Sequence, residues 1–397
     1  MLKMITFIPK IRFKNFLNHW SYTELKEVKD VRDGTHSSPK YIDNGYPLVT
    51  SKNLTDSGLN LNDVSLISES DYNEINKRSK VEGGDILLGL IGTIGKPVLV
   101  DSDGFAIKNV GLIKNGGQIQ NQFLLQYLKT NIFNKYIQIE MAGNTQKFLG
   151  LETLRNTKVP VPSPEKQSAI GSLFRTLDDL LSSYKDNLTN YQSLKATMLS
   201  NMFPKAGQTV PEIRLDGFED EWEEKEFSKL VKRVTQSSDS DSLPKVEFED
   251  IISGQGRLNK DISSKLNNRK GIHFKPGYTL YGKLRPYLNN WLLTKFEGVA
   301  LGDFWVFDPN GNDSNFIYYL VQSNRYQKVA NDTSGTKMPR SDWKSVSSTI
   351  FAIPQTIAEQ QAIGAYFSNI DNLIKSHQEK ISQLETLKKK LLQDMFI

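Results

Sequence analysis

Two long stretches of the chain carry apolar residues at intervals of three and four positions. One runs from Phe174 to Met202 and the other from Phe367 to Met395. This spacing lines the apolar side chains along one face of an α-helix, and a narrow stripe sustained over about four heptads is typical of a coiled coil. The residues expected to pack between two such helices are Phe174, Leu177, Leu181, Leu188, Tyr191, Leu194 and Met198 in the first, and Phe367, Ile370, Ile374, Ile381, Leu384, Leu387 and Leu391 in the second.

The pattern also predicts where these helices begin, end and pair. Prolines at positions 160, 162, 164 and 354 precede them, and Pro204 follows the first helix. A narrow apolar stripe needs a partner, and the equivalent helix of the same chain is the nearest one. We therefore expect helices over residues 163–203 and 355–397 that form an antiparallel coiled coil. The short connection at 204–210 and the repeat described below indicate the direction.

The two remaining regions, residues 1–162 and 204–354, have the pattern of mixed α/β domains. Short apolar runs broken by glycine predict strands, and longer runs with helical spacing predict helices. The expected elements are strands within 47–54, 84–100 and 104–113 and a helix over 121–140 in the first region, and strands within 277–284 and 298–307 and a helix near 315–329 in the second. The predicted fold class is α+β, with two mixed α/β domains separated by the two long helices.

The sequence contains an internal repeat. The segment from Pro9 to Trp20 recurs as Pro211 to Trp222, 202 positions later. The repeats at the starts and ends of the long helices lie 193 positions apart, and they pair Gln167, Gly171, Phe174, Asp178, Lys195 and Phe203 with Gln360, Gly364, Phe367, Asp371, Lys388 and Phe396. The residues between the repeated segments diverge. We therefore expect a frame with pseudo-two-fold symmetry that holds two different inserts, with the chain termini close together.

Composition limits the class of protein. The 397 residues, of which 38% are hydrophobic and 24% charged, suffice for two or three ordinary globular domains. There are no cysteines, which excludes a disulfide framework and thiolate metal sites. The absence of a long apolar run predicts no membrane-spanning helix, and the lysines near the N-terminus do not fit a signal peptide. We expect a cytoplasmic protein. The net charge of +5 requires that any nucleic-acid binding come from local patches.

The sequence lacks the arrangement of a recognisable catalytic or metal site. The glycine-rich segment from Gly89 to Pro97 fails the phosphate-loop spacing, because Leu90 stands where a glycine is needed and Pro97 where a hydroxyl residue is needed. The segment Glu223–Lys225 is expected to be a solvated helix start. Four histidines, at positions 19, 36, 273 and 377, lack the spacing of metal ligands, and we expect no metal and no cofactor on this chain.

Polar and basic clusters on loops are the remaining candidates for function. Arginine, lysine, asparagine, glutamine, serine and threonine are side chains that reach phosphates and base edges of DNA. The candidate DNA-binding residues are Arg32, Thr35, His36, Ser51, Lys52, Asn53, Thr93, Thr145, Gln146 and Lys147 in the first insert, and Lys283, Arg285, Tyr287, Asn289, Ser334, Thr336, Lys337 and Arg340 in the second. Each cluster alone could be a solvated loop, but the clusters recur at matching points of the two inserts.

These residues together resemble the specificity subunit of type I restriction-modification systems, over nearly the whole chain. The resemblance rests on the repeated Pro9–Trp20 and Pro211–Trp222 segments, on the motif Asp33-Gly34-Thr35-His36, and on the strand motif from Gly84 to Lys96. Proline- and glutamine-rich segments before both long helices complete it. The second insert departs from the pattern, because it lacks Asp-Gly-Thr-His and has Gly282-Lys283-Leu284-Arg285 in place of the Gly-Thr-Ile-Gly turn.

The resemblance implies a protein that recognises DNA without catalysing a reaction. Each insert would be a target recognition domain reading one half of an asymmetric, bipartite site in double-stranded DNA, and the helix pair would set the gap. Two modification subunits would methylate adenine with S-adenosylmethionine, and restriction subunits would use ATP and magnesium for cleavage. Two alternatives remain open from the residues alone, a free-standing DNA-binding regulator with two modules and a coiled-coil adaptor that binds proteins.

Overall fold

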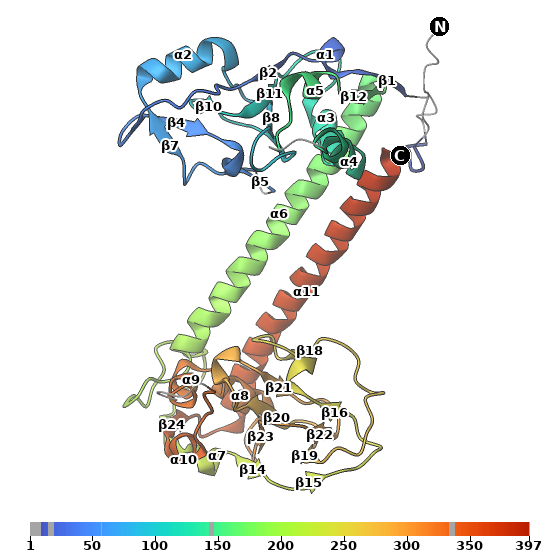
Figure 1. The fold of residues 1–397 in the computed structure, drawn as a ribbon. Coiled ribbons are helices and arrows are strands. Elements are labelled where there is room, and N and C mark those ends of the chain that lie inside the picture. Colours follow the sequence, from blue (N-terminus) through green and yellow to red (C-terminus); the bar gives the residue numbers. More distant parts are fainter. Residues whose placement is uncertain (1–8, 15–19, 57, 143–146, 333–337, 397) are drawn as a thin grey trace. The chain divides into compact units, whose positions relative to one another are not determined.

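The computed structural model describes residues 9–14, 20–56, 58–142, 147–332 and 338–396 (Figure 1). The chain divides into two compact units. The first comprises residues 1–184 and 380–397, and the second comprises residues 185–379. Each unit therefore contains one insert, the start of the long helix that follows it, and the end of the other long helix.

The first unit is built from short strands and helices. The strands are β1 (Ser21–Glu24), β2 (Val31–Asp33), β3 (Tyr41–Ile42), β4 (Tyr46–Val49), β5 (Leu54–Thr55), β6 (Gly58–Leu59), β7 (Ser65–Ile67), β8 (Ile86–Gly89), β9 (Pro97–Leu99), β10 (Ala106–Ile107), β11 (Val110–Ile113) and β12 (Lys158–Val161). The helices are α1 (Leu25–Val28), η1 (Ser51–Asn53), α2 (Glu69–Ser79), α3 (Asn121–Leu128), α4 (Asn131–Glu140), α5 (Leu151–Arg155) and the start of α6 (Pro164–Asn201).

The second unit repeats this plan with different details. Its strands are β13 (Glu223–Glu226), β14 (Lys232–Val234), β15 (Ser237–Ser238), β16 (Lys245–Val246), β17 (Ile251–Ile252), β18 (Arg257–Leu258), β19 (Gly271–Phe274), β20 (Thr279–Gly282), β21 (Trp291–Leu293), β22 (Gly298–Ala300), β23 (Phe304–Asp308) and β24 (Ile350–Ile353). Its helices are α7 (Phe227–Leu230), η2 (Phe248–Asp250), η3 (Pro286–Leu288), α8 (Ser314–Leu320), α9 (Asn324–Ala330), α10 (Trp343–Ser348) and the start of α11 (Ile357–Met395).

One four-stranded sheet has the same topology in both units. Its strand order is β2-β11-β8-β9 in the first unit and β14-β23-β20-β21 in the second. The register also agrees, because Val110 opposes Gly89 and Phe304 opposes Gly282 at the same end of the central strand pair. The central strands are buried apart from Asp308 at the end of β23, which their apolar runs explain. This shared sheet confirms that one architecture carries both inserts.

A second four-stranded sheet differs between the units. Its order is β10-β4-β7-β3 in the first unit, where β4 pairs in parallel with β10 and antiparallel with β7. In the second unit the order is β15-β19-β22-β16, and β22 takes the central place with a parallel partner, β16, and an antiparallel partner, β19. The difference in strand topology between the two units therefore lies in this second sheet.

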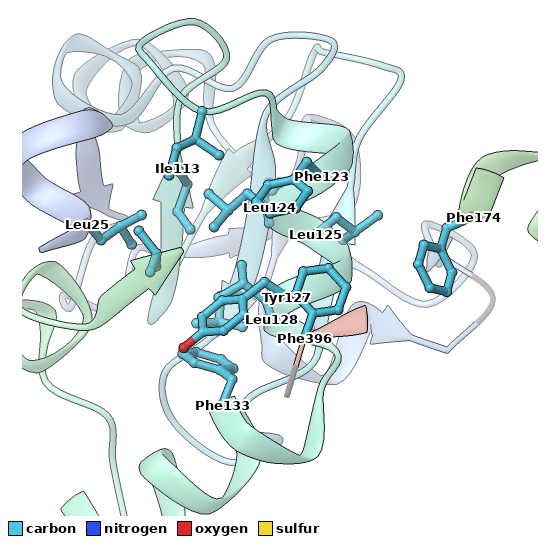
Figure 2. Close-up of a cluster of buried hydrophobic side chains, with 14 of the residues drawn as sticks. Leu25, Ile113, Phe123, Leu124, Leu125, Tyr127, Leu128, Phe133, Phe174 and Phe396 are labelled. Carbon is cyan, nitrogen blue, oxygen red and sulfur yellow. The ribbon is translucent and has the colours of Figure 1, made fainter. Parts of the chain in front are cut away.

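The repeated aromatic residues join each insert to the long helices. In the first unit Phe396, near the end of α11, packs against Phe123 of α3 and Phe174 of α6, with ring centroids 5.5 and 6.5 Å apart (Figure 2). The second unit makes the equivalent contact with Phe203, which lies 5.7 Å from Phe316 and 6.0 Å from Phe367. In each unit, the end of one long helix therefore packs against the same aromatic core as the start of the other.

A repeated glutamine fixes the start of each long helix. The amide oxygen of Gln167 accepts a hydrogen bond from the Gln120 backbone at 2.7 Å, and its amide nitrogen donates to the Pro162 carbonyl at 2.9 Å. Gln360 does the same with the Asp313 backbone at 2.9 Å and the Pro354 carbonyl at 3.1 Å. Both side chains are buried, so their polar groups need these partners. The repeated glutamine therefore fixes the first turn of each long helix to the insert that precedes it.

Within each unit the two long helices run antiparallel. In the first unit Asp178 pairs with Lys388, while Phe174 contacts Phe396. In the second, Lys195 pairs with Asp371 at 2.7 Å. There Tyr191 contacts His377 with ring centroids 5.2 Å apart. As the residue number rises on α6, the partner's number falls on α11. The ion pairs are reciprocal copies, because Asp178 and Lys195 correspond to Asp371 and Lys388 in the repeat.

Two of the expected packing residues do not pack between the helices. Leu194 and Leu387 are 37% and 45% exposed, so their assignment to the helix pair is wrong. Each directly precedes a lysine, Lys195 or Lys388, which takes the inward position because its ammonium group reaches an aspartate of the facing helix. The other predicted positions are buried or half-buried: Phe174, Leu177, Leu181, Leu188, Tyr191, Met198, Phe367, Ile370, Ile374, Ile381, Leu384 and Leu391.

Several element boundaries differ from the sequence-based expectation. The single helix expected over 121–140 is two helices, because the Thr130 hydroxyl caps α4 by accepting a hydrogen bond from the Phe133 backbone. The helix near 315–329 is likewise split at Ser323. Residues Glu223–Lys225 are not a helix start but part of β13, which pairs with β24. The expected contact between termini involves residues outside the described ranges, and the nearest described contact is the hydrogen bond from Ile11 N to Asp394 O at 3.1 Å.

Candidate nucleic-acid interface

In the first unit the predicted loops gather at one end of the shared sheet. Strand β2 ends at Asp33, β8 ends at Gly89, and β11 begins at Val110, and the strand register brings these three ends together. The loops that leave this end contain Thr35 and His36, Thr93, and the segment before β11. Residues from three separate stretches of sequence therefore form one polar surface.

His36 is the centre of this surface. Its Nε2 lies 2.8 Å from Asp33 Oδ2, and its Nδ1 lies 2.9 Å from the Asn109 side-chain oxygen. The hydrogen bonds to Asn109 and Asp33 raise the pKa of His36 above its usual value, which favours the protonated ring that donates from both nitrogens. Arg78 donates to the other oxygen of Asp33 at 2.7 Å. The motif Asp-Gly-Thr-His thus builds a cationic cluster on a buried carboxylate.

The turn Ser51–Asn53 supports the neighbouring loop. The buried Ser51 hydroxyl donates to the Ile91 carbonyl, which places this turn against the glycine-rich segment. Asn53 is also buried, and its amide donates to the carbonyls of Asn60 and Asp63 at 3.2 and 2.8 Å. Lys52 is the exposed member of the turn. Of these three predicted residues, the structure presents only Lys52 to solvent.

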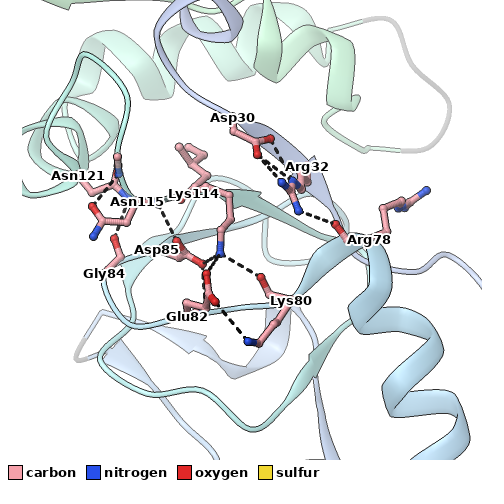
Figure 3. Close-up of polar contacts among 12 residues, drawn as sticks. Asp30, Arg32, Arg78, Lys80, Glu82, Gly84, Asp85, Lys114, Asn115 and Asn121 are labelled. Atoms are coloured by element: carbon pink, nitrogen blue, oxygen red, sulfur yellow. Dashed lines mark hydrogen bonds and ion pairs between the residues drawn. The ribbon is translucent and has the colours of Figure 1, made fainter.

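Arg32 lies apart from the loop cluster. Its guanidinium group donates to the Asp30 carboxylate, with the shortest distance 2.6 Å, and to the Arg78 carbonyl at 3.2 Å (Figure 3). The same figure shows the neighbouring network in which Lys114 pairs with the buried Asp85 at 2.6 Å. Arg32 remains partly exposed and is bound by Asp30, while the side chain of Arg78 extends to Asp33 in the loop cluster.

The second unit places its predicted residues at the equivalent end of the sheet. Lys283 and Arg285 follow β20, and Arg340 forms an isolated bridge with Leu284. Asp303, directly before β23, accepts a hydrogen bond from Arg340 at 2.9 Å, and the Lys283 ammonium group lies 3.6 Å away. The loop therefore carries two cations that converge on one carboxylate.

The backbone of this second loop is unusual. Arg285 and Asn289 have φ values of 49° and 55°, the left-handed region that side chains other than glycine seldom adopt. They bracket the short helix η3, whose Tyr287 is 57% exposed. In the first unit the equivalent turn uses Gly92, with φ of 80°. The second domain thus presents an arginine where the first presents a glycine.

The counterpart of the Ser51–Asn53 turn has the opposite charge. Asp250 occupies the place of Asn53, since both close a capping box and both accept a hydrogen bond from a later asparagine backbone, at 2.8 and 2.9 Å. Asp250 is buried and pairs with Lys265 at 2.6 Å. Burial acts to raise the pKa of Asp250, but hydrogen bonds from Lys265 and the Glu247 backbone outweigh it and lower that pKa. The second domain therefore has Glu249 and Asp250 where the first has Lys52 and Asn53.

Some predicted residues lie outside the described part of the chain. These are Thr145 and Gln146 in the first insert and Ser334, Thr336 and Lys337 in the second. The described residues that follow these segments make equivalent contacts in the two units. Phe148 forms a β-bridge with Ile91 in the first unit, and Arg340 forms one with Leu284 in the second. Lys147 is exposed beside Phe148.

Sequence reasoning missed Arg78, Lys108 and Asn109 in the first unit and Asp303 in the second. Arg78 lies on a helix remote in sequence, and Lys108 and Asn109 look like an ordinary turn between strands. One sequence feature could have pointed to Asn109: asparagine adopts the left-handed backbone conformation more readily than most residues, and this one directly precedes an apolar strand. Asn109 does have a φ of 56°. Among the described residues there is no group of acidic, histidine or cysteine residues that could hold a metal ion. The same part of the chain has no helix long and apolar enough to span a membrane.

Comparison with known proteins identifies relatives over the full length. The family described as the type I restriction modification DNA specificity domain matches twice, at residues 18–191 and 219–386. A putative type I restriction enzyme MjaX specificity subunit of Methanocaldococcus jannaschii is 23% identical over 394 residues, covering 94% of this chain and 92% of the relative. The EcoBI specificity subunit of Escherichia coli is 27% identical over 202 residues, covering 46% of this chain and 41% of the relative.

A solved structure has the same fold. The S subunit of a type I restriction-modification system from M. genitalium superposes with a TM-score of 0.63 at 14% sequence identity, covering 98% of this chain and 99% of that one. A structure described as the basis of complex assembly and conformational transition of the type I restriction-modification system gives a TM-score of 0.52 at 15% identity, with 97% and 99% covered.

Proposed function

We propose a function that starts from family membership: the chain belongs to the type I restriction modification DNA specificity family, of which it carries two domain copies. It is a specificity subunit with two recognition domains. We infer that each domain reads one half of an asymmetric, bipartite site in double-stranded DNA. The recognition domains would comprise residues 1–162 and 204–354, and the spacer helices residues 163–203 and 355–397.

One observation carries the proposal. The same sheet, in the same register, ends in both units in a cluster of loops that bear different side chains. A common scaffold with divergent loops at one end is expected where two domains must dock on chemically similar backbones and yet distinguish different bases. The cations at these ends, such as Lys108 and His36 in one unit and Lys283 and Arg340 in the other, suit the phosphate contacts that such docking requires.

We infer that α6 and α11 form an antiparallel coiled coil that fixes the gap between the half-sites. The reciprocal ion pairs Asp178–Lys388 and Lys195–Asp371 support this arrangement, because they set the same register in each unit. A rigid spacer converts the separation of two domains into a fixed number of base pairs, as in other proteins that read two half-sites. Adding or removing whole helical turns within 170–203 should therefore change the gap.

The subunit itself would be non-catalytic. Two modification subunits using S-adenosylmethionine would dock on it and methylate adenine, and restriction subunits using ATP and magnesium would join them. Exposed leucines support two equal docking places, since Leu180 and Leu387 in the first unit correspond in the repeat to Leu373 and Leu194 in the second. An apolar surface repeated in this way suits two copies of one partner.

Methylation mapping tests the proposed function. The chain is co-expressed with its neighbouring modification subunit, and methylated adenines are mapped by single-molecule sequencing. We expect a bipartite motif with a fixed gap that disappears when the gene for this chain is deleted. Methylation that persists unchanged after the deletion would contradict the proposal.

A domain-specific variant sharpens the test. Lys283→Ala combined with Arg285→Asn, which the left-handed backbone tolerates, should alter one half-site and leave the other intact. The matched control is Lys275→Asn, an exposed lysine before the opposite end of β20. Equal loss of both half-sites in the double variant would show that these side chains do not belong to one reader.

A further inference from the structure

Asn109 and Asp303 occupy the same place in the two units. Asn109 directly precedes Val110, which opposes Gly89, and Asp303 directly precedes Phe304, which opposes Gly282. Their carbonyl oxygens accept equivalent hydrogen bonds, from Leu90 N at 3.3 Å and from Lys283 N at 2.9 Å. The two residues are therefore structural counterparts, although neither belongs to a repeated sequence motif.

The Asn109 side chain is held by one of its two polar groups. Its oxygen accepts the hydrogen bond from His36 Nδ1 at 2.9 Å, and His36 is anchored in turn on Asp33 at 2.8 Å. This leaves the amide nitrogen, with two N–H donors, on a half-buried residue at the loop surface. Asn109 thus presents hydrogen-bond donors whose direction is fixed by a neighbour.

The Asp303 side chain presents the opposite polarity. Its carboxylate, also half-buried, lies 2.9 Å from Arg340 Nη2 and 3.6 Å from Lys283 Nζ. A carboxylate offers about four lone-pair positions and no donor, so two basic neighbours orient it without exhausting its acceptors. Asp303 is therefore an oriented acceptor at the position where Asn109 is an oriented donor.

Side chains of this kind distinguish bases in the major groove. Donors recognise the N7 acceptor of guanine or adenine, the O6 acceptor of guanine or the O4 acceptor of thymine, while a carboxylate recognises the exocyclic amino group of cytosine or adenine. The surrounding lysine, arginine and histidine side chains supply the positive charge that a polar or acidic side chain needs in order to approach DNA. An acidic residue at such a surface repels phosphates, so its place there fits base contact better than backbone contact.

We propose that Asn109 and Asp303 are counterpart base-reading residues, the first presenting donors to an acceptor edge and the second presenting acceptors to an amino group. His36 and Arg340 are their positioning residues. The inference rests on the proposed function, because it assumes that the loop end of each shared sheet faces DNA. It assigns a hydrogen-bonding polarity to one base of each half-site, with an acceptor atom of guanine, adenine or thymine read by the first domain and an amino group of cytosine or adenine read by the second.

A reciprocal exchange of the two side chains tests the proposal. Asn109→Asp and Asp303→Asn keep the size of each side chain; the first removes the two N–H donors, and the second replaces one acceptor oxygen with a donor. Each variant is assembled with the modification subunits, and its preferred sites are determined by methylome mapping and by selection from a random duplex library. We expect each variant to change the preferred base pair at one position of one half-site, by on the order of tenfold to a hundredfold, with the other half-site unchanged.

Matched controls exclude a general effect of charge or backbone. Asn310→Asp repeats the first exchange at another left-handed asparagine, with φ of 52°, and Asp308→Asn repeats the second at the far end of β23. Both controls should retain the wild-type site. The variant His36→Gln should weaken discrimination at the position that Asn109 reads and leave the other half-site intact, which a purely structural role of His36 would not do.

The outcomes separate this inference from the proposed function. A wild-type complex without a chain-dependent bipartite motif would overturn the proposed function itself. A bipartite motif that both exchange variants preserve at every position would overturn only the assignment of Asn109 and Asp303. A uniform loss of affinity for all sequences, with unchanged unfolding transitions, would also overturn it, since that result indicates backbone contact.

Discussion

The repeated glycine at the start of each long helix allows a matched pair of substitutions. Gly171 and Gly364 correspond in the repeat, and each faces the first turn of an insert helix, α3 or α8. An alanine at Gly171 would place its Cβ 3.1 Å from Gln122 Cβ. An alanine at Gly364 would lie 2.7 Å from Asn315 Cβ and 2.8 Å from Asp313 Oδ1. Both distances at Gly364 are shorter than a Cβ atom tolerates. One of them involves Asp313, whose side chain caps α8.

The expected change in the free energy of unfolding is the sum of a stabilising and a destabilising contribution. Replacing glycine with alanine inside a helix stabilises it by roughly 1 kcal/mol, and this gain is shared by both sites. At Gly364 the clash displaces the Asp313 carboxylate, which accepts the Phe316 backbone hydrogen bond at 2.9 Å. Loss of such a cap costs about 1 kcal/mol and overpacking about 1–3 kcal/mol. We expect Gly364→Ala to destabilise the second unit by about 1–3 kcal/mol, and Gly171→Ala to change the first unit by less than about 1 kcal/mol.

Native-state hydrogen exchange with mass spectrometry measures the two units separately in the same sample. The helices α3 and α8 provide the equivalent reporters, because each contacts the substituted position. The Gly364→Ala variant should accelerate exchange in α8 while α3 remains unchanged. Equal destabilisation at both sites, or a larger cost at Gly171, would refute the reasoning that the close approach at Asp313 and Asn315 decides the outcome.

Three further outcomes are expected. The Lys29 ammonium group is buried and donates to the Ile119 carbonyl at 3.0 Å, and burial lowers its pKa to about 8. The unfolded chain therefore holds more protons between pH 8 and its ordinary pKa of 10.5. The stability of the first unit should rise with pH across that window by about 1–2 kcal/mol, an amount reduced by solvent screening, and a Lys29→Gln variant should lose this slope in urea titrations. Lys195→Met should lower the unfolding free energy of the second unit by about 1–3 kcal/mol in denaturant unfolding, because Asp371 loses its cation. Adding Asp371→Leu should recover most of this loss, and a failure to recover it would show that the ion pair contributes net stability. Trp222→Phe removes the 3.0 Å hydrogen bond from the indole to the buried Glu359 carboxylate; it should cost about 1.5–3 kcal/mol, and an unchanged unfolding midpoint would show that the bond contributes nothing.

The sequence determined the frame of this protein because the frame depends on repeated, local patterns. Helical periodicity predicted both long helices, and their observed bounds, 164–201 and 357–395, lie within the expected ranges. The repeated Gln167, Gly171 and Phe174 mark contacts that recur in both units, which is why their spacing carried information. Even so, the stripe alone misassigned Leu194, because spacing does not reveal that the lysine beside it reaches a carboxylate on the facing helix.

The tertiary structure alone decided which residues form the candidate DNA-binding surface of each unit. Asn109 becomes part of it through strand register and through a bond to His36, 73 positions earlier. Asp303 does so through Arg340, 37 positions later. Conversely, Asn53 leaves the surface because its amide is needed by two backbone carbonyls. Periodicity and local motifs follow from the backbone's own geometry, so a sequence displays them. Whether a polar side chain is available to bind DNA depends on the hydrogen-bond partners that folding places beside it. Those partners are distant in sequence, so no local spacing encodes them.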